Sequence, residues 1–319
     1  MKKYANNVLG VLSKQKTLVA VLAFFVIMPF LSKTFYSVNN FSQMLLQSSY
    51  MIVIATGVTF VMLCGAVDLS VGGVMCMSGI FACMLQKYLP LWLVLLVVLA
   101  GGAILGFMTG VMVAKLHMHP FITTLGLGLI YKGINLVVTD TRTILGTDPL
   151  FKTFGTLKFF KLVPLQFVVA VLIVVIAHLV LSRTEFGRNC YAVGGDDNVA
   201  KYSGINIIRQ RVIAFLISGV LAALGGFFVS ARMNSGNATF GDMTSLLVNC
   251  SVVVGGTKMS GGVGGAFNTL VGVFLFAVLE SSMNLLGINV YIQQASQGLI
   301  IVFILGIACL LKKKKLEDV

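Results

Sequence analysis

Apolar runs of membrane-spanning length recur from one end of this 319-residue chain to the other. A helix of about 15 to 25 apolar residues can cross a hydrocarbon core roughly 30 Å thick. The pattern therefore predicts an all-α membrane protein, a polytopic helical bundle of about ten transmembrane segments. The run 246–256 is too short to cross alone unless it begins earlier or belongs to a broken helix. The expected spans are Leu18–Leu31, Met44–Cys64, Leu69–Leu85, Leu91–Val113, Phe121–Val138, Leu162–Leu181, Val212–Ala231, Leu246–Gly256, Phe267–Leu286 and Gly298–Leu311.

Composition agrees with this pattern. Hydrophobic residues make up 58% of the chain and charged residues 10%, and the mean hydropathy is +0.99. Soluble domains carry roughly a quarter charged residues, so the soluble globular class is excluded. The net charge of +13 is distributed in short groups beside the apolar runs, as orientation signals are. No basic, aromatic-rich face is present, so nucleic acid is not an expected partner.

The basic residues also predict the orientation of the chain. With the N-terminus in the cytoplasm, most of the 23 lysines and arginines fall on the inner side, as the positive-inside rule requires. This arrangement places both termini in the cytoplasm, together with the tail 312–319. It also places the interval 183–211 there, the longest polar stretch of the chain.

The interval 183–211 contains the signals of one short helix. Gly194 and Gly195 interrupt the chain, and Asp196 or Asp197 can accept hydrogen bonds from the free N–H groups of the following turn. The residues from Asn198 to Ser203 provide one or two turns, and Gly204 stands where helices commonly end in a left-handed conformation. A solvated loop with a capped turn is the alternative.

Two glycine-rich stretches resemble each other, Gly65–Gly73 and Gly255–Gly262. Aligned, Gly65 matches Gly255, Asp68 matches Lys258 and Ser70 matches Ser260. Transporters are often built from repeats whose broken helices meet beside the substrate path, although a chance match of glycine-rich sequence remains the alternative. Asp68 borders two apolar runs, where a carboxylate needs a partner. It is expected to cap the third span, to line a substrate path, or both.

Motifs for chemistry are absent. The stretch Gly256–Ser260 lacks the Gly-Lys-Ser/Thr order of a phosphate-binding loop. The three histidines have no further ligand at metal-binding spacing, and the six cysteines form no CxxC pair. No nucleophile–base set is visible. We therefore expect no enzyme activity, no metal and no cofactor.

Five stretches that occur in order are characteristic of a known family. Together they resemble the permease subunits of bacterial sugar ABC importers of the ribose, galactose, xylose and autoinducer-2 type, over residues from about 40 to 310. The stretches are GAVDLSVG from Gly65, PFITTLG from Pro120, FGRNCYAVGG from Phe186, AKYSGI from Ala200 and GGTKMSGG from Gly255.

The resemblance implies a single transmembrane permease domain, 1–319, with an importer-permease fold in the lipid of a bacterial cytoplasmic (inner) membrane. Such a subunit provides the path for a monosaccharide, a ribose-like pentose or a hexose, and leaves ATP hydrolysis to a separate cytoplasmic ATPase chain. The other implied partners are an extracytoplasmic sugar-binding protein and a second permease chain, identical or related. The interval 183–211 would be the cytoplasmic coupling loop, and its short helix, Gly194–Gly204, would be the coupling helix that docks in a groove of the ATPase.

The resemblance also implies roles for particular residues. Coupling to the ATPase is assigned to Gly194, Gly195, Asp196, Asn198, Ala200 and Gly204, and the central gate to Gly65, Asp68, Ser70, Gly255, Gly256 and Ser260. Asn249, Asn268 and Thr59 are candidate polar residues of the path, with ordinary interhelical hydrogen bonds as the alternative. The chain departs from the usual family pattern at Lys132, Ser245, Leu247 and Lys258, which leaves the identity of the sugar open.

Two other functions remain open. The nearer is a permease of the same architecture for nucleosides or branched-chain amino acids. The second is a channel or ion-coupled transporter without an ATPase, which would be expected to carry more buried ionisable residues than this chain has.

Overall fold

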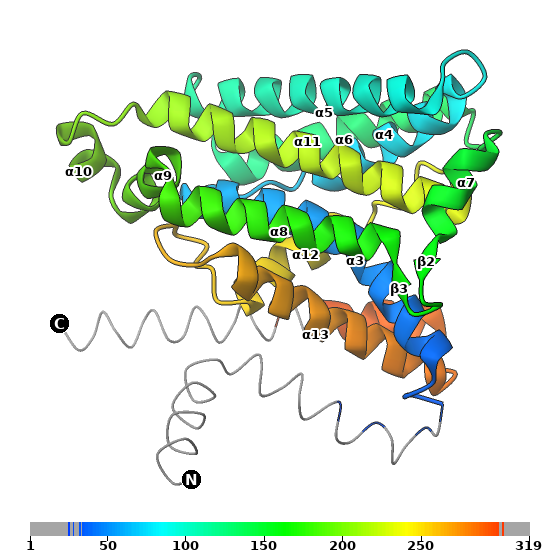
Figure 1. Ribbon diagram of the computed structural model, residues 1–319. Coiled ribbons are helices and arrows are strands. Elements are labelled where there is room, and N and C mark those ends of the chain that lie inside the picture. The colour runs from blue at the N-terminus through cyan, green and yellow to red at the C-terminus, as the bar shows by residue number, and fades with distance from the viewer. Residues whose placement is uncertain (1–24, 26–27, 29–31, 33, 300–301, 303–319) are drawn as a thin grey trace, which may run out of the picture.

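The computed structural model describes residues 25, 28, 32, 34–299 and 302. Its long helices lie roughly along one axis (Figure 1). At one end, the α9–α10 end, lie α9 (Glu185–Gly195) and α10 (Asp197–Tyr202); at the other, the α7 end, lies α7 (Pro149–Thr156). Two short antiparallel pairs join loops: β1 (Ile144–Leu145) with β4 (Ser235–Gly236), and β2 (Lys158–Phe159) with β3 (Val163–Pro164).

The predicted polytopic helical architecture is confirmed. Within the described ranges, six helices are long and apolar enough to cross a membrane, and two apolar helices are shorter. Each of the eight expected spans that falls in these ranges corresponds to one helix. The expected spans Leu18–Leu31 and Gly298–Leu311 and the tail 312–319 lie wholly or largely outside the described residues. The eight helices are α3 (Val38–Leu63), α4 (Val71–Leu85), α5 (Leu91–Ala114), α6 (Pro120–Thr139), α8 (Leu165–Arg183), α11 (Ile207–Met233), α12 (Thr244–Val254) and α13 (Ala266–Leu285).

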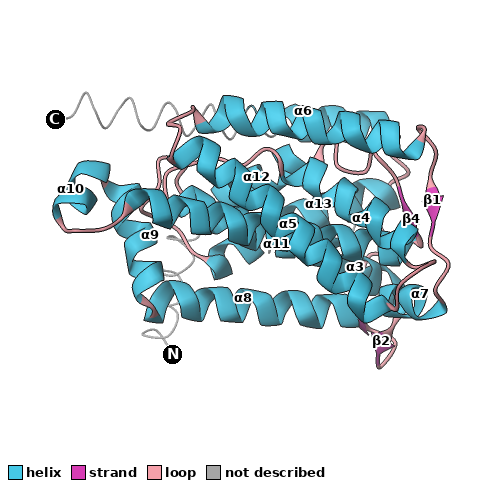
Figure 2. Ribbon diagram, turned by 90° about the horizontal axis from the view of Figure 1, so that it is seen from above, coloured by secondary structure: helices cyan, strands magenta, loops and turns pink. Residues whose placement is uncertain are grey.

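Helix α3 is the centre of the bundle. It packs against α8, α11, α12 and α13, and 89% of its most apolar window is buried. The corresponding share is 22% for α5 and 28% for both α6 and α8, so these three helices form the periphery. Figure 2 shows α6 and α8 on opposite flanks of the bundle.

Glycines allow α5 and α11 to cross in close contact. A side chain on Gly106 would meet the carbonyl oxygen of Phe215, and one on Gly219 would meet that of Gly102. Small residues at four-residue spacing permit such close backbone approach between membrane helices, where lipid offers no hydrophobic driving force. Gly101, next to this contact, faces open space.

Helices α4 and α12 each begin halfway along the bundle and run in opposite directions. Asp68, just before α4, bonds to Ser218, which lies eleven residues into α11. From there α4 runs toward the α7 end, whereas α12 runs toward the α9–α10 end and finishes beside the start of α13. The first turns of the two half-length helices meet where the N–H of Gly72 donates to Oγ of Ser245 at 2.9 Å. The short run 246–256 therefore forms the half-length helix α12, which begins at Thr244 and ends at Val254.

The glycine contact predicts different effects for two neighbouring substitutions in α5. Gly106→Ala is expected to lower the free energy of unfolding by about 1–3 kcal/mol, because the new methyl group overpacks the α5–α11 crossing. Gly101→Ala, with nothing within 4 Å, is the matched control and should be neutral or slightly stabilising. Thermal unfolding of both variants in detergent checks this, and equal shifts would contradict it.

Candidate functional site

Asp68 lies at the middle of the bundle and is only 2% exposed. Its Oδ1 accepts hydrogen bonds from the N–H and hydroxyl of Ser70, at 3.0 and 2.6 Å, and its Oδ2 accepts one from the Ser218 hydroxyl at 2.8 Å. The expectation that Asp68 caps the third span needs correction. Ser70 is the N-cap residue of α4, and the helix begins at Val71, so the carboxylate binds the residue before the first turn and ties it to α11.

Asn249 of α12 completes this cluster. Its side-chain Nδ2 donates to the carbonyl oxygens of Asp68 and Ser245, both at 2.8 Å. Its buried Oδ1 has no hydrogen-bond partner within the described part of the chain. The structure thus brings together two predicted gate residues, Asp68 and Ser70, and one predicted residue of the path, Asn249. Sequence analysis missed Ser218, for which the only signal is one hydroxyl in an apolar run, and noted Ser245 only as a departure from the family pattern.

Helices α3 and α12 end in the same way. Gly65 has φ +76° and Gly256 has φ +100°, and each is followed by an N–H bonded to the carbonyl five residues earlier, Ala66 to Val61 and Thr257 to Val252. This turn requires its left-handed residue at the position after the helix cap. Gly65 therefore corresponds to Gly256, and the predicted register, which matched Gly65 to Gly255, was wrong by one residue.

The end of α9 packs directly on two glycine loops, the one that follows α3 and the one that follows α12. The N–H of Gly262 donates to the carbonyl oxygen of Leu63 at 3.0 Å, and a side chain on Gly194 would overlap both of these groups. Gly261, with φ +89°, lies against the Gly194 backbone, and a side chain on Gly65 would meet the Ser260 carbonyl oxygen. We call Gly65, Gly194, Gly261 and Gly262 the glycine junction. It joins one predicted coupling residue, Gly194, to one predicted gate residue, Gly65, and a second predicted gate residue, Ser260, lies beside it.

Two side chains reinforce this junction. The Nε of Arg211 donates to the carbonyl oxygen of Cys64 at 3.2 Å, while its Nη2 contacts both carboxylate oxygens of Asp197 at 2.9 Å. The hydroxyl of Tyr191 in α9 donates to the carbonyl oxygen of Gly264 at 3.0 Å, and burial raises the pKa of this phenol. The sequence identified Arg211 only as a basic charge and Tyr191 only as part of the stretch FGRNCYAVGG, without a role of its own.

The predicted short helix is present as α10, Asp197–Tyr202, within one residue of the expected bounds. Asp196 caps it, with Oδ1 accepting from the N–H groups of Asn198 at 2.8 Å and Val199 at 3.1 Å. Gly204 has φ +80°, as expected for the helix stop. The predicted coupling residues do not share one surface: Gly194 and Ala200 are buried, whereas Gly195, Asp196, Asn198 and Gly204 are exposed. The exposed apolar side chains of α10 are Val199 and Tyr202, 63% and 91% exposed.

The interval 183–211 holds more helix than expected. Helix α9 precedes α10, and α11 already begins at Ile207. Gly194 and Gly195 therefore end a helix instead of interrupting a loop. The missed signal is the pair Thr184 and Glu185, since the Thr184 hydroxyl oxygen accepts from the Gly187 N–H at 3.1 Å as an N-cap does.

The remaining predicted residues lie apart from these clusters. Thr59 of α3 shares a 2.7 Å hydrogen bond with Thr269 of α13, which is an ordinary interhelical contact. A side chain on Gly255 would meet the carbonyl oxygen of Asn268, so both residues belong to the packing of α12 on α13. Among the described residues, no group of three His, Cys, Asp or Glu side chains could hold a metal ion.

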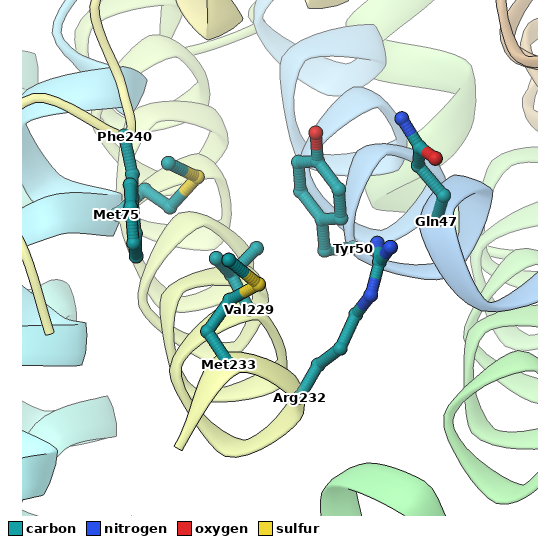
Figure 3. Close-up of a pocket in the computed structure, with 7 residues that line it drawn as sticks. All are labelled: Gln47, Tyr50, Met75, Val229, Arg232, Met233 and Phe240. Atoms are coloured by element: carbon teal, nitrogen blue, oxygen red, sulfur yellow. The ribbon is translucent and has the colours of Figure 1, made fainter. Parts of the chain in front are cut away.

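A cavity of about 230 Å³ lies between α3, α4 and α11 toward the α7 end (Figure 3). Tyr50 and the Arg232 guanidinium stand on one side of it and Met75 and Phe240 on the other. Gln47 of the same lining also interacts with Glu280 of α13. None of the predicted gate or coupling residues lines this cavity.

Half-length helices that meet inside a polytopic bundle are characteristic of many membrane transport proteins. Residues 40–305 match the family described as branched-chain amino acid transport system / permease component. The chain belongs to this permease family, and its predicted resemblance to the permease subunits of bacterial sugar ABC importers is confirmed. It is accordingly a multi-pass membrane protein and a transport component.

Curated relatives match along almost the whole chain. The ribose import permease protein RbsC of Haemophilus influenzae is 36% identical over 295 residues, 91% of each chain. RbsC of Bacillus subtilis is 35% identical over 309 residues, 96% of this chain and 94% of the relative. The galactose/methyl galactoside import permease protein MglC of Salmonella typhimurium is 33% identical over 317 residues, 93% and 94% of the two chains. No solved structure matches.

The hydrogen bonds of Asp68 predict a coupled loss of stability. Asp68→Ala is expected to lower the free energy of unfolding by roughly 3 kcal/mol, because the buried N–H and hydroxyl of Ser70 and the hydroxyl of Ser218 lose their acceptor. In a double-mutant cycle with Ser218→Ala, thermal unfolding should give a coupling energy of about 1 kcal/mol or more. Strictly additive effects would mean that the Asp68–Ser218 contact contributes nothing.

Proposed function

We propose that this chain forms the translocation path for a monosaccharide, a ribose-like pentose or a hexose, in an ABC importer. An extracytoplasmic binding protein delivers the sugar, a cytoplasmic ATPase supplies the energy, and a second permease chain, identical or related, completes the path. The names of the relatives, ribose and galactose import permeases that align over more than 90% of this chain, support a sugar. The whole chain, 1–319, then acts as one permease domain.

The α9–α10 end is the cytoplasmic end in this proposal. The interval 183–211 lies there and carries five basic residues, which fits the positive-inside rule. The same orientation puts both termini in the cytoplasm of a bacterial cell whose cytoplasmic (inner) membrane holds the protein. The basic residues of the interval are Arg183, Arg188, Lys201, Arg209 and Arg211.

The observation that carries the proposal is the mechanical connection of α10 to the centre of the bundle. Arg211 bonds Asp197 of α10 and the carbonyl oxygen of Cys64 at the end of α3, while Gly194 contacts both glycine loops. A capped helix with rigid contacts passes on a displacement that a solvated loop would absorb. Movement of α9 and α10 would therefore reach the loop 64–70 directly.

The central gate is the Asp68 cluster in this mechanism. Asp68, Ser70 and Asn249 hold the first turns of α4 and α12 together halfway along α11. Closure of the ATPase domains would shift α9 and α10, pull on Cys64 and Gly65, and separate these two turns. The sugar would pass as they separate. The Ser260 carbonyl oxygen lies beside Gly65 at the same junction, while Gly256 forms the left-handed turn after α12 and Gly255 packs the end of α12 on Asn268 of α13.

A branched-chain amino acid is the second candidate cargo, because the family description names that class. Uptake of radiolabelled ribose, galactose, leucine and a nucleoside into proteoliposomes distinguishes the candidates. The importer is reconstituted with its ATPase and binding protein. We expect uptake of a monosaccharide only, and uptake of leucine or the nucleoside alone would overturn the choice of cargo.

The exposed apolar side chains of α10 predict where the ATPase docks. Tyr202→Ala and Val199→Asp should abolish co-purification with the ATPase, because Tyr202 and Val199 present the apolar surface of this short helix. Gly195→Pro and Asp196→Lys should do the same, the first by distorting the connection between α9 and α10 and the second by removing the cap of α10, whereas Asp196→Asn keeps a capping oxygen and should retain binding. Phe160→Ala, equally exposed at the α7 end, is the control. Unchanged complexes with Tyr202→Ala and Val199→Asp would overturn this docking surface.

Arg211 predicts a separation of docking from coupling. Arg211→Met should leave the ATPase bound and hydrolysing ATP while sugar uptake per ATP falls by roughly tenfold, a loss of about 1.4 kcal/mol in coupling. The cause is the lost link between Asp197 and Cys64. Arg209→Met is the matched control, since Arg209 is exposed two residues earlier on the same helix. Parallel measurement of ATP hydrolysis and uptake checks this, and wild-type coupling in Arg211→Met would contradict it.

A further inference from the structure

A charged pair, Lys132 and Asp242, lies on the outer surface of the bundle, away from both ends of the bundle. The Nζ of Lys132 in α6 is 2.8 Å from Oδ2 of Asp242, and the two side chains are 38% and 41% exposed. Lys132 precedes the end of α6 at Thr139 by seven residues, which is about 10 Å along a helix. Among the described membrane-crossing helices, no other charged residue lies so far from both ends of its helix.

This position is incompatible with contact to hydrocarbon. Lysines near a helix end can extend the ammonium group to the membrane surface, but the ammonium of Lys132 is held by Asp242 at this depth. The carboxylate of Asp242 is too short to reach the surface. The outer faces of α5 and α8 differ: α5 carries no charged residue and α8 none before Arg183. We therefore place water beside the exposed face of the pair.

Lys132 and Asp242 line a cavity of about 230 Å³. Its floor is Leu69, Gly72 and Gly73, which lead into and begin α4. Ser245, in the first turn of α12, lies in the same lining and accepts the hydrogen bond of the Gly72 N–H. The cavity is thus built where the two half-length helices meet, next to the Asp68 cluster. The lining also includes Leu129 of α6.

The charges of this cavity balance. Helix N-termini carry a partial positive charge, and those of α4 and α12 both lie here. Asp68 precedes α4 and Asp242 precedes α12, while Lys132 is paired with Asp242. The cavity therefore offers strong hydrogen-bond donors and acceptors without a large excess of either charge. This suits a neutral polyhydroxyl ligand better than a free anion or cation.

We propose that this cavity is a binding site on the translocation path, at which the hydroxyl groups of a passing monosaccharide bind Lys132, Asp242 and Ser245. The inference rests on the proposed function and assigns it a sugar-contacting site. Pockets for drug-sized ligands have volumes of roughly 300–1,000 Å³. This cavity is smaller, which fits a ligand as small as a single sugar ring. Because the floor is the start of α4, separation of α4 from α12 at the gate would also dismantle the site and release the sugar.

Thiol labelling tests whether this face meets water, independently of transport. The full-length protein in lipid nanodiscs carries Leu129→Cys, in the cavity lining, or Ile176→Cys, on the outer face of α8. These residues lie at matched depth, ten residues before the end of α6 and eleven after the start of α8. A charged, membrane-impermeant thiol reagent should label Leu129→Cys and leave Ile176→Cys at the level of the parent chain, whose described cysteines are buried.

Charge variants test the contact with sugar in the reconstituted importer. Lys132→Met and Asp242→Asn, singly and combined, should reduce uptake of ribose or galactose by roughly tenfold or more. The combined variant leaves no unpaired charge, so its folding and ATPase binding should be retained. The control is Arg142→Met combined with Asp140→Asn, which removes a fully exposed pair just beyond α6 and should leave uptake unchanged.

The outcomes separate the two proposals. Equal labelling of Leu129→Cys and Ile176→Cys, or wild-type sugar uptake by the combined charge variant, would overturn the binding site and leave the importer function intact. If the parent chain transports neither sugar, the proposed sugar importer fails. A labelled Leu129→Cys would then still show a water-filled path, but the assignment of sugar as its ligand would be overturned.

Discussion

One close backbone contact determines how helices α9 and α10 and the core of this permease fit together. The carbonyl oxygen of Leu63, at the end of the central helix α3, accepts the N–H of Gly262 where a side chain at position 194 would otherwise stand. Because residue 194 is a glycine, the last turn of α9 lies directly on the loops that follow α3 and α12. Any larger residue would push α9 away and separate the surface helices from the centre of the bundle.

The membrane core imposes the second constraint. Lipid cannot satisfy free backbone groups, so non-helical backbone at this depth must be enclosed by protein or line a water-filled cavity. The broken crossings of α4 and α12 meet this requirement with side-chain partners. Asp68 accepts from Ser70 and Ser218, Ser245 accepts from Gly72, and Asn249 donates to the Asp68 carbonyl oxygen. The same groups that satisfy the broken backbone also provide the polar centre that a sugar path needs.

Sequence reasoning succeeded where local signals are strong and failed where contacts are distant. The long spans follow from unbroken apolar runs, and α10 follows from the capping residue Asp196 and the stopping residue Gly204, eight positions apart. Helix α9 was missed because Gly194 and Gly195 were interpreted as a break in a loop, and the N-cap signal of Thr184 was not considered. The register of the glycine loops was wrong because only the backbone shows that Gly65 and Gly256 have the left-handed conformation.

The sequence by itself determined the membrane environment, the helical architecture, the family and the position of the short helix α10. These properties depend on the hydropathy of whole segments and on motifs of adjacent residues. Only the tertiary structure decided that Gly194 touches the loops of α3 and α12, that Arg211 links Asp197 to Cys64, and that Lys132 meets Asp242 110 positions away. Such contacts depend on the packing of distant helices, which no local pattern of residues specifies.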